Sequence, residues 1–531
     1  MQDPRDPQTL TSTPSADDAP RRGRRRPAGR GGGGDRTTVQ QRPWKQPRLR
    51  YEPTRAVSDD ELESIHQASL RILEEIGMDF LLPEARQMLK AAGADVDPDS
   101  ERVRLDRGLV EQALSTAPSR FTLHARNPDH NLEMGGDYMA FCCIGSAPNA
   151  SDMEGGRRPG THKDFRDLVR LSQALNVVHV NGGYPVEPID LPPRTRHLDA
   201  LSDLATLTDK LFHAYSLGRT RILDGLEMVR IARGVDAERL MREPSLFTII
   251  NTNSPLKLDG PMLEGMMEMA RHNQVVVVTP FTLAGAMAPV TLAGALALQN
   301  AEALAGLVVT QAANPGAPTA YGGFTSNVDM KSGAPAFGTP EYMRTALVGG
   351  QLARRYGLPY RSSNVTSANT VDAQAGYESV FSLWGAVMGG VNLLKHGTGW
   401  MEGGLCASFE KMILDADLLQ MVAEFLEPIE ISEAAFAVDA IREVGPGGHF
   451  FGSPHTMERY RDAFYAPMVS DWRNYESWRE AGAPDAMTHA HRIYKQLLAD
   501  YTPPPMDPAI AEELAAFVAR RKEEGGAPAD T

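Results

Sequence analysis

The feature that most constrains this chain is one pattern that recurs eight times after residue 136: an apolar segment, a polar or glycine-rich turn, and a helical stretch. The apolar segments have the length and β-branched content of strands. Eight strand–helix units over roughly 290 residues match the size of a (β/α)8 barrel. The predicted strands are 138–145, 177–182, 211–218, 246–253, 274–281, 318–324, 358–364 and 391–397.

An open, doubly wound α/β sheet is the alternative fold. It is disfavoured because the sequence contains no strand followed by a GxGxxG fingerprint and no P-loop. The run "QVVVV" at 274–278 is continuously apolar, which is typical of a parallel strand covered on both faces. We therefore predict an α/β protein whose TIM barrel spans residues 136–427.

The segments that flank the barrel are predicted to be mainly helical. The N-terminal cap region spans 51–135 and begins with a helix that Ser58 caps and Gly77 ends. The C-terminal extension spans 428–531 and contains two amphipathic stretches near its end, at 485–501 and 509–523.

Residues 1–50 form a basic, low-complexity leader that we expect to be disordered. Residues 1–55 carry 13 Lys and Arg against 6 Asp and Glu, a charge of +7, so the rest of the chain must carry −21 to give the net −14. The leader could attract nucleic acid or another acidic partner nonspecifically, but a solvated tail is the simpler interpretation. The acidic body argues against an enzyme that acts on nucleic acid.

Several classes of protein are disfavoured by absent patterns. No window approaches ~20 consecutive apolar residues, and the N-terminus has no apolar secretory segment, so we predict a cytoplasmic protein with no membrane contact. The three cysteines, two of them adjacent, suit neither a disulfide framework nor a zinc cluster. We expect no metal site of the chain's own. Homo-oligomers are common for such barrels, although the sequence shows no interface.

In a (β/α)8 barrel, the carboxyl ends of the strands and the loops after them form the active face. Here these positions carry mostly amides, hydroxyls and aromatic rings, with few carboxylates or histidines. The sequence has no HExxH, no GxSxG and no evident pair of carboxylates, which disfavours metal-dependent, serine and glycoside hydrolysis. Neutral polar walls with several rings suit a methylated cation, since aromatic faces attract a quaternary ammonium by ~0.5–2 kcal/mol per ring.

Six segments then carry a resemblance to a known family: "INTNSPL", "VVTPFTLAGAMAPVT", "SGAPAFGTPE", "DAQAGYES", "HGTGWMEGGL" and "EVGPGGHFFGSPHT". In this order they resemble the trimethylamine methyltransferase family of corrinoid-dependent methyltransferases, in the branch without pyrrolysine. The resemblance implies a TIM barrel that moves a methyl group from a methylated amine to Co(I) of a separate corrinoid protein. Pyrrolysine-bearing members place that residue near positions 361–370, where this sequence has ordinary residues.

The branch without pyrrolysine is associated with quaternary amines such as glycine betaine, which the resemblance therefore implies as substrate. A quaternary nitrogen is already charged, so the amine departs neutral without a proton, and the enzyme has to align the methyl group and exclude water. A cavity poor in acids and bases tolerates such a reaction.

The predicted roles follow from the strand ends together with this resemblance. Rings are expected to surround the trimethylammonium group, and polar groups to bind the carboxylate. Glu402 is expected to orient His396 through a hydrogen bond, and both are predicted catalytic residues. The predicted ring residues are Phe281, Tyr321, Phe324 and Trp400; the predicted polar residues are Asn251, Asn253, Arg361 and His396; Gly397 and Gly399 are expected to let the corrinoid approach, and the loop 445–455 is a further candidate contact.

Three alternatives stay open. Trimethylamine or another methylamine could be the substrate. A lyase or hydrolase of small polar metabolites would need an acid–base pair, which only His396 and Glu402 offer. A degenerate barrel could instead bind betaines without turning them over.

Overall fold

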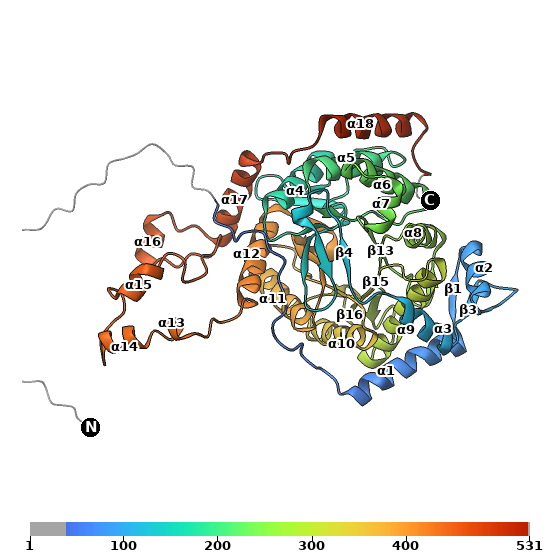
Figure 1. Cartoon of the computed structure of the whole chain (residues 1–531), viewed down its shortest axis with the longest axis horizontal. Coiled ribbons are helices and arrows are strands. Elements are labelled where there is room, and N and C mark those ends of the chain that lie inside the picture. The colour runs from blue at the N-terminus through green and yellow to red at the C-terminus, as the bar shows by residue number, and fades with distance from the viewer. Residues whose placement is uncertain (1–38, 529–531) are drawn as a thin grey trace, which may run out of the picture. The chain divides into compact units, whose positions relative to one another are not determined.

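The eight predicted strands form one closed parallel barrel in the computed structural model, which describes residues 39–528 (Figure 1). The strand order is β10-β9-β6-β19-β18-β15-β13-β11, so successive barrel strands are neighbours in the sheet and the last strand, β19, pairs with the first, β6. A parallel bridge between His213 and Phe247 joins the two ends of this order. The barrel prediction is therefore confirmed. The strands are β6 (Ala140–Cys143), β9 (Val180–Asn181), β10 (Leu211–Phe212), β11 (Phe247–Ile250), β13 (Val275–Val278), β15 (Thr319–Gly322), β18 (Tyr360–Ser363) and β19 (Leu393–Thr398).

A helix follows every barrel strand, and most of these helices begin at a side chain that caps the first turn. Asp259 accepts a hydrogen bond from Met262 N, and Ser408 accepts one from Lys411 N. The eight helices are α4 (His162–Ala174), α5 (Arg196–Leu207), α6 (Arg219–Arg233), α8 (Gly260–Arg271), α9 (Leu292–Ala313), α10 (Pro340–Tyr356), α11 (Ala373–Met388) and α12 (Phe409–Phe425); a short α7 (Ala237–Arg242) follows α6.

Helix α9 is the one helix of the described chain that is long and apolar enough to cross a membrane. Its most apolar 18-residue window is 83% buried within the protein. It is also the helix that packs between the barrel and α1 (Asp59–Arg71), where Ser69 Oγ donates to Ala297 O at 2.9 Å. The apolar length of α9 thus reflects a helix buried on most of its circumference.

The N-terminal region differs from the prediction because it also contains short strands. Helices α1, α2 and α3 are present, but three of the strands pair into a small sheet, β12-β1-β3-β2, whose fourth member comes from a barrel loop. Two or three paired residues per strand leave too short an apolar run to be distinguished from a turn in the sequence. The elements are a π-helical turn Ile72–Ile76, β1 (Met78–Phe80), α2 (Pro83–Ala91), β2 (Asp95–Val96), β3 (Arg102–Arg104), α3 (Arg107–Thr116) and β12 (Lys257–Leu258).

A hairpin of β4 (Phe121–Leu123) and β5 (Leu132–Met134), joined through a 3-10 turn Pro128–His130, closes the amino-terminal end of the barrel. Its Leu123 and Met134 belong to the same buried cluster as inward-facing strand residues such as Phe247. His124 N donates to Pro244 O at 2.7 Å, just before β11 begins. With this end filled, access to the barrel interior is left to the carboxyl ends of the strands.

Two small sheets extend the strand ends on that open side. One is β14 (Phe281–Ala284), β16 (Phe324–Val328) and β17 (Pro335–Ala336). The other is β20 (Trp400–Met401), β21 (Cys406–Ser408), β7 (Asn149–Asp152) and β8 (Gly156–Pro159), with a 3-10 turn Glu402–Gly404 between β20 and β21. Phe281 pairs in register with Phe324, so these two rings enter the site side by side.

The two ends of the described chain pack against the barrel helices. Residues 39–50 fall within the predicted leader, and their Arg48 pairs with Asp137 at 2.8 Å while Leu49 is buried. Residues 1–38 of that leader lie outside the described residues. The C-terminal extension contains α13 (Glu433–Phe436), α14 (Val438–Val444), α15 (Pro454–Arg459), α16 (Tyr475–Glu480), α17 (Ala486–Asp500), which packs on α12, and α18 (Pro508–Glu523), which packs on α5 and α6.

Candidate active site

A cavity of about 410 Å3 lies at the carboxyl ends of the strands; we call it the mouth cavity. The segments that follow β6 and β10, the strands β11, β18 and β19, and both small sheets contribute to it. The structure brings six of the predicted site residues together in its lining: Asn251, Phe281, Phe324, Arg361, His396 and Trp400.

Aromatic rings form one wall of the mouth cavity. The Phe281 and Phe324 ring centroids lie 5.0 Å apart, and those of Phe324 and Trp400 lie 6.3 Å apart. Phe337 packs behind them at 5.7 Å from Phe324 and 6.2 Å from Trp400. Trp400 Nε1 donates to Thr366 O at 3.1 Å, which fixes the indole in the loop after β19. Such a wall can bind a methylated cation through its ring faces.

His396 lies against this wall as a neutral imidazole. Its ring centroid is 4.2 Å from that of Trp400, and its Nδ1 lies 3.2 Å from Ser363 Oγ. Burial first, and then the positive charges of Lys395 and Arg361, hold the pKa of His396 well below its ordinary value. At neutral pH the imidazole can donate or accept a hydrogen bond with a ligand, but it carries no charge.

Arg361 places a buried cation beside the rings. It is 3% exposed, and its guanidinium carbon lies 5.4 Å from the Phe324 centroid. Its Nε and Nη1 have no hydrogen-bond partner among the described residues. Burial lowers the pKa of Arg361 to about 10, so it is fully charged at neutral pH. A buried guanidinium with unused donors is costly unless a ligand supplies the acceptors.

Lys395 is a second buried cation in the same lining and is not among the predicted site residues. Its Nζ donates to the carbonyl of Gly182. A Cβ at Gly145 would lie 2.7 Å from Nζ, and one at Gly182 would lie 2.6 Å from it, so two glycines make room for the ammonium. Burial, and then the nearby Arg361, lower the pKa of Lys395 to about 8. Within residues 39–528, no carboxylate appears among the charges that act on Lys395 or Arg361.

A backbone irregularity in β19 explains how Lys395 and His396 both reach the cavity. Successive side chains of a regular strand point to opposite faces. The pairing of β19 with β6 shifts register between Leu394 and Thr398, and His396 has a positive φ of 56°. This β-bulge turns two consecutive side chains toward the same space.

The opposite side of the mouth cavity is polar. Ile249 N donates to His213 Nε2 at 3.1 Å, which leaves the hydrogen of the neutral ring on Nδ1. Tyr215 Oη lies 2.7 Å from Ser146 Oγ and accepts from Tyr184 N at 3.1 Å. Both rings therefore have fixed orientations at the cavity edge.

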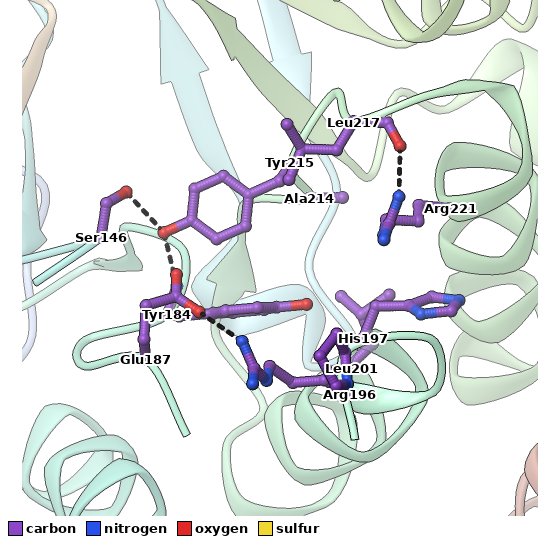
Figure 2. Close-up of a pocket in the computed structure, with 11 residues that line it drawn as sticks. Ser146, Tyr184, Glu187, Arg196, His197, Leu201, Ala214, Tyr215, Leu217 and Arg221 are labelled. Atoms are coloured by element: carbon purple, nitrogen blue, oxygen red, sulfur yellow. Dashed lines mark hydrogen bonds and ion pairs between the residues drawn. The ribbon is translucent and has the colours of Figure 1, made fainter. Parts of the chain in front are cut away.

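Tyr215 also separates the mouth cavity from a smaller pocket of about 250 Å3 (Figure 2). The two spaces share Ser146, Tyr215 and Leu217 in their linings. Figure 2 shows Tyr215 reaching toward Ser146, with Arg196 and Arg221 on the α5 and α6 side of the pocket. Arg221 Nη1 donates to Leu217 O at 2.8 Å, so this arginine braces the loop after β10.

Three predicted residues lie elsewhere. Tyr321 faces the helices: its hydroxyl donates to Asn300 Oδ1 of α9 at 3.0 Å, so it does not line the cavity. Glu402 pairs with Arg157 at 2.8 Å, and Ser363 rather than Glu402 contacts His396. Asn253 Oδ1 accepts from Asp259 N at 3.0 Å at the start of α8, which is a structural contact in the loop.

The predicted corrinoid-contact residues Gly397 and Gly399 are packed against neighbouring segments and do not line the mouth cavity. A Cβ at Gly397 would lie 2.8 Å from Cys142 O, and one at Gly399 would lie 3.3 Å from Ile144, so both are needed for packing. Gly403 and Gly404, which follow them, line the cavity and have positive φ values of 63° and 97°. These two glycines leave this part of the rim free of side chains.

The residues missed in the sequence are Lys395, His213 and Tyr215. Lys395 carried a usable signal, since it directly follows Leu393 and Leu394 in a strand that proves buried at all six positions. A charge in such a strand needs a counter-charge or a ligand. His213 and Tyr215 follow a run of only two paired residues, where the sequence does not indicate which side chains point inward.

Comparison with known proteins gives concordant results. The profile of the family described as trimethylamine methyltransferase (MTTB) matches residues 21–526. A glycine betaine methyltransferase of Desulfitobacterium hafniense is 38% identical over 471 residues, which is 88% of this chain and 98% of that protein. A trimethylamine methyltransferase MttB of Methanosarcina barkeri is 31% identical over 468 residues, which is 86% of this chain and 93% of that protein.

Among solved structures, the monomethylamine methyltransferase (MtmB) of Methanosarcina barkeri matches with a TM-score of 0.49 at 11% identity. The match covers 84% of this chain and 88% of that one.

Proposed function

The chain belongs to the trimethylamine methyltransferase family, and from that premise we propose that it demethylates a betaine, a quaternary amine that also carries a carboxylate, with glycine betaine as the first candidate. Members of this family transfer methyl groups to corrinoid proteins. The proposal concerns which methylated amine enters the mouth cavity and which residues bind its two ends.

The observation that carries the proposal is the pair of buried cations. Arg361 and Lys395 are each 3% exposed and both line the mouth cavity, and Arg361 has unused donors there. A carboxylate would supply both the missing charge and the missing acceptors, and charge-assisted hydrogen bonds of this kind are about twice as strong as neutral ones. A substrate without an anionic group would leave both cations unpaired.

The aromatic wall suits the other end of a betaine. Trp400, Phe281 and the face of Phe324 turned away from Arg361 offer ring surfaces to the trimethylammonium group. The two cations would repel a simple ammonium ion, whereas a zwitterion brings its own negative charge to them. The cavity therefore favours a betaine over a methylammonium ion or a neutral amine.

The reaction requires no acid–base catalysis by the chain. The N–CH3 bond breaks with its electron pair remaining on nitrogen, so the tertiary amine leaves neutral and needs no proton. When bound, the reduced corrinoid of the partner protein supplies the nucleophile that accepts the methyl group. The chain's own residues align the substrate: the neutral His396 and the rings fix the ammonium end, and the cations fix the carboxylate.

The rim of the cavity fits a flat group brought by a partner. Gly403 and Gly404 present backbone only, and a Cβ at Gly404 would lie 2.6 Å from the Trp400 ring. These two glycines would leave the rim free of side chains where a corrinoid of the partner approaches. A cytoplasmic location and the absence of a metal of the chain's own remain predictions.

Calorimetric binding and turnover together test the proposal. Glycine betaine should bind to the purified chain, while choline, which has the same ammonium group without the carboxylate, should bind at least about tenfold more weakly, since one charged contact is worth about 1.5–3 kcal/mol. With a reduced corrinoid protein, the demethylated tertiary amine should accumulate and be detected by NMR.

The variants Arg361→Leu and Lys395→Met should each reduce affinity for glycine betaine, whereas affinity for choline should not fall and should rise as a repelling cation is removed. Lys210→Met is the matched control, because Lys210 is also a buried lysine but precedes β10 at the opposite end of the barrel and donates to Ser172 O and Leu175 O. Equal binding of choline and glycine betaine would refute the carboxylate assignment. Binding without turnover would favour a betaine-binding barrel, and turnover of trimethylamine alone would favour the methylamine alternative.

A further inference from the structure

The segment 427–482, which we call the arm, connects α12 to α17 and contains the four short helices α13 to α16 (Figure 1). Within the described chain, none of the residues in these four helices is buried. Twelve large apolar side chains of the arm are exposed, among them Ile429 at 81%, Phe451 at 86%, Phe464 at 88% and Trp472 at 73%.

Such a segment cannot supply its own stability. Isolated helices shorter than ~12 residues are marginal in water, and the arm helices have only four to seven residues each. Ordering a chain costs about 1–2 kcal/mol per residue in backbone entropy, which has to be offset by burial. The arm therefore needs an apolar surface to pack against.

A receiving surface of this kind is exposed on the same chain. Tyr377, Val380 and Phe381 of α11 are 62%, 38% and 38% exposed and lie three and four residues apart, on one face of the helix. Met421 and Phe425 of α12 are 48% and 45% exposed at a spacing of four. Trp384 of α11 packs against Phe425 of α12 with ring centroids 5.0 Å apart, so the exposed stripes of the two helices meet there, and we call these five side chains the α11–α12 face.

We propose that the arm of one copy covers the α11–α12 face of a second copy, and the reverse, in an arm-exchanged homodimer. The arm starts directly after α12, so the arm and the face it would cover are adjacent on each copy, and a two-fold axis between two α12 helices satisfies both at once. The arm and the face together expose seventeen large apolar side chains per chain, a scale that suits the 20–30 residues a side of a standard interface.

A second attachment of the arm to α12, within its C-terminal half, supports exchange with a second copy. Tyr465 Oη and the backbone N of Met468 and Val469 donate to the Asp417 carboxylate of α12, with the Val469 contact at 3.1 Å. The arm is thus fixed beside α12 at its start and again at residues 465–469, while the α11–α12 face of the same copy stays exposed. A second copy presents that face without any change in these contacts.

Light scattering on the full-length chain tests the proposal. The wild type should have about twice the 57.8 kDa chain mass at micromolar concentration. An arm variant (Phe451→Asp with Phe464→Asp) and a face variant (Tyr377→Asp with Phe381→Asp) should each give the single-chain mass with an unchanged circular dichroism spectrum. Met330→Asp is the control, because Met330 is 71% exposed but lies outside both surfaces, and its mass should stay doubled.

Mixing the two variants distinguishes exchange from other dimers. The intact arm of the face variant can cover the intact face of the arm variant, so the equimolar mixture should recover part of the doubled mass that neither variant shows alone. A single-chain mass for the wild type would overturn the proposal, as would doubled masses for both variants or no recovery on mixing. If the wild type is a monomer and the arm variant loses binding to a corrinoid protein, the arm is a surface for that partner instead.

Discussion

Replacing Lys395 by methionine should make this protein more stable and a poorer receptor for betaines. The substitution keeps an unbranched side chain of similar length and removes a cation that is 3% exposed and has no carboxylate partner among residues 39–528. Methionine occupies the space of the lysine stem and leaves empty only the Nζ position beside Gly145 and Gly182. The substitution requires no change in the backbone of β19.

The magnitude follows from the pKa of Lys395. Its fall from the ordinary 10.5 to about 8 means that the folded state disfavours the charged form by about 3 kcal/mol. The lost hydrogen bond to the Gly182 carbonyl offsets about 1 kcal/mol of this gain. The variant should therefore be about 2 kcal/mol more stable than the wild type at pH 7.

The pH dependence of this stability difference shows whether the buried charge of Lys395 causes it. Because the pKa is lower in the folded protein, the cost of the buried charge is fully present below pH 8 and disappears as the pH rises through 10.5, where both states carry a neutral amine. The stability advantage of the variant should shrink over the same interval.

Differential scanning calorimetry without ligand provides the measurement. With roughly 490 ordered residues the unfolding entropy is about 1 kcal/mol per kelvin, so the midpoint should rise by only about 2 °C at pH 7. Titration calorimetry on the same samples should show weaker glycine betaine binding. A variant less stable than the wild type at pH 7, or one that keeps full affinity, would refute the reasoning that this charge is present for a ligand.

Three further outcomes follow from the same site. The affinity of the wild type for glycine betaine, measured by calorimetry, should be constant below pH 8 and fall above it as Lys395 loses its proton; a flat profile to pH 9.5 would exclude the ammonium from binding. Gly404→Ala should lower betaine affinity at least about tenfold and quench or shift the fluorescence of Trp400, because the new Cβ would lie 2.6 Å from the indole at a φ of 97°. Trp400→Leu should weaken glycine betaine by about 0.5–2 kcal/mol and leave the binding of a small carboxylate such as acetate unchanged; equal losses for both would mean that the ring does not contact the ammonium end.

The barrel was predictable because its signal is repeated and local. Each parallel strand is covered on both faces and so appears as an apolar run, and eight such runs with helices between them leave few alternative folds. The short strands β1 to β3 and the two small sheets at the mouth were not predicted, since two to four paired residues give no periodicity.

The site was predictable in part for the same reason. A strand buried on both faces has no polar side, so the sequence does not reveal which residues face the interior. The predicted cavity residues therefore include Tyr321, although its hydroxyl contacts Asn300 of α9, and omit Lys395, although it lines the cavity. Phe281, Phe324 and Trp400 were found because they stand beyond the strand ends, where either orientation leads to the mouth.

The irregular stretch of β19 between Leu394 and Thr398 has a consequence for how substrate preference could change in such a barrel. It gives one strand two adjacent positions that look into the cavity, so an ammonium and an imidazole are delivered together. Deleting a single residue there would restore strict alternation and send one of the two groups outward among the helices. The number of residues between Leu394 and Thr398 therefore matters more than the identity of Lys395 or His396. It decides whether the barrel can bind the carboxylate end and the ammonium end of one small molecule together.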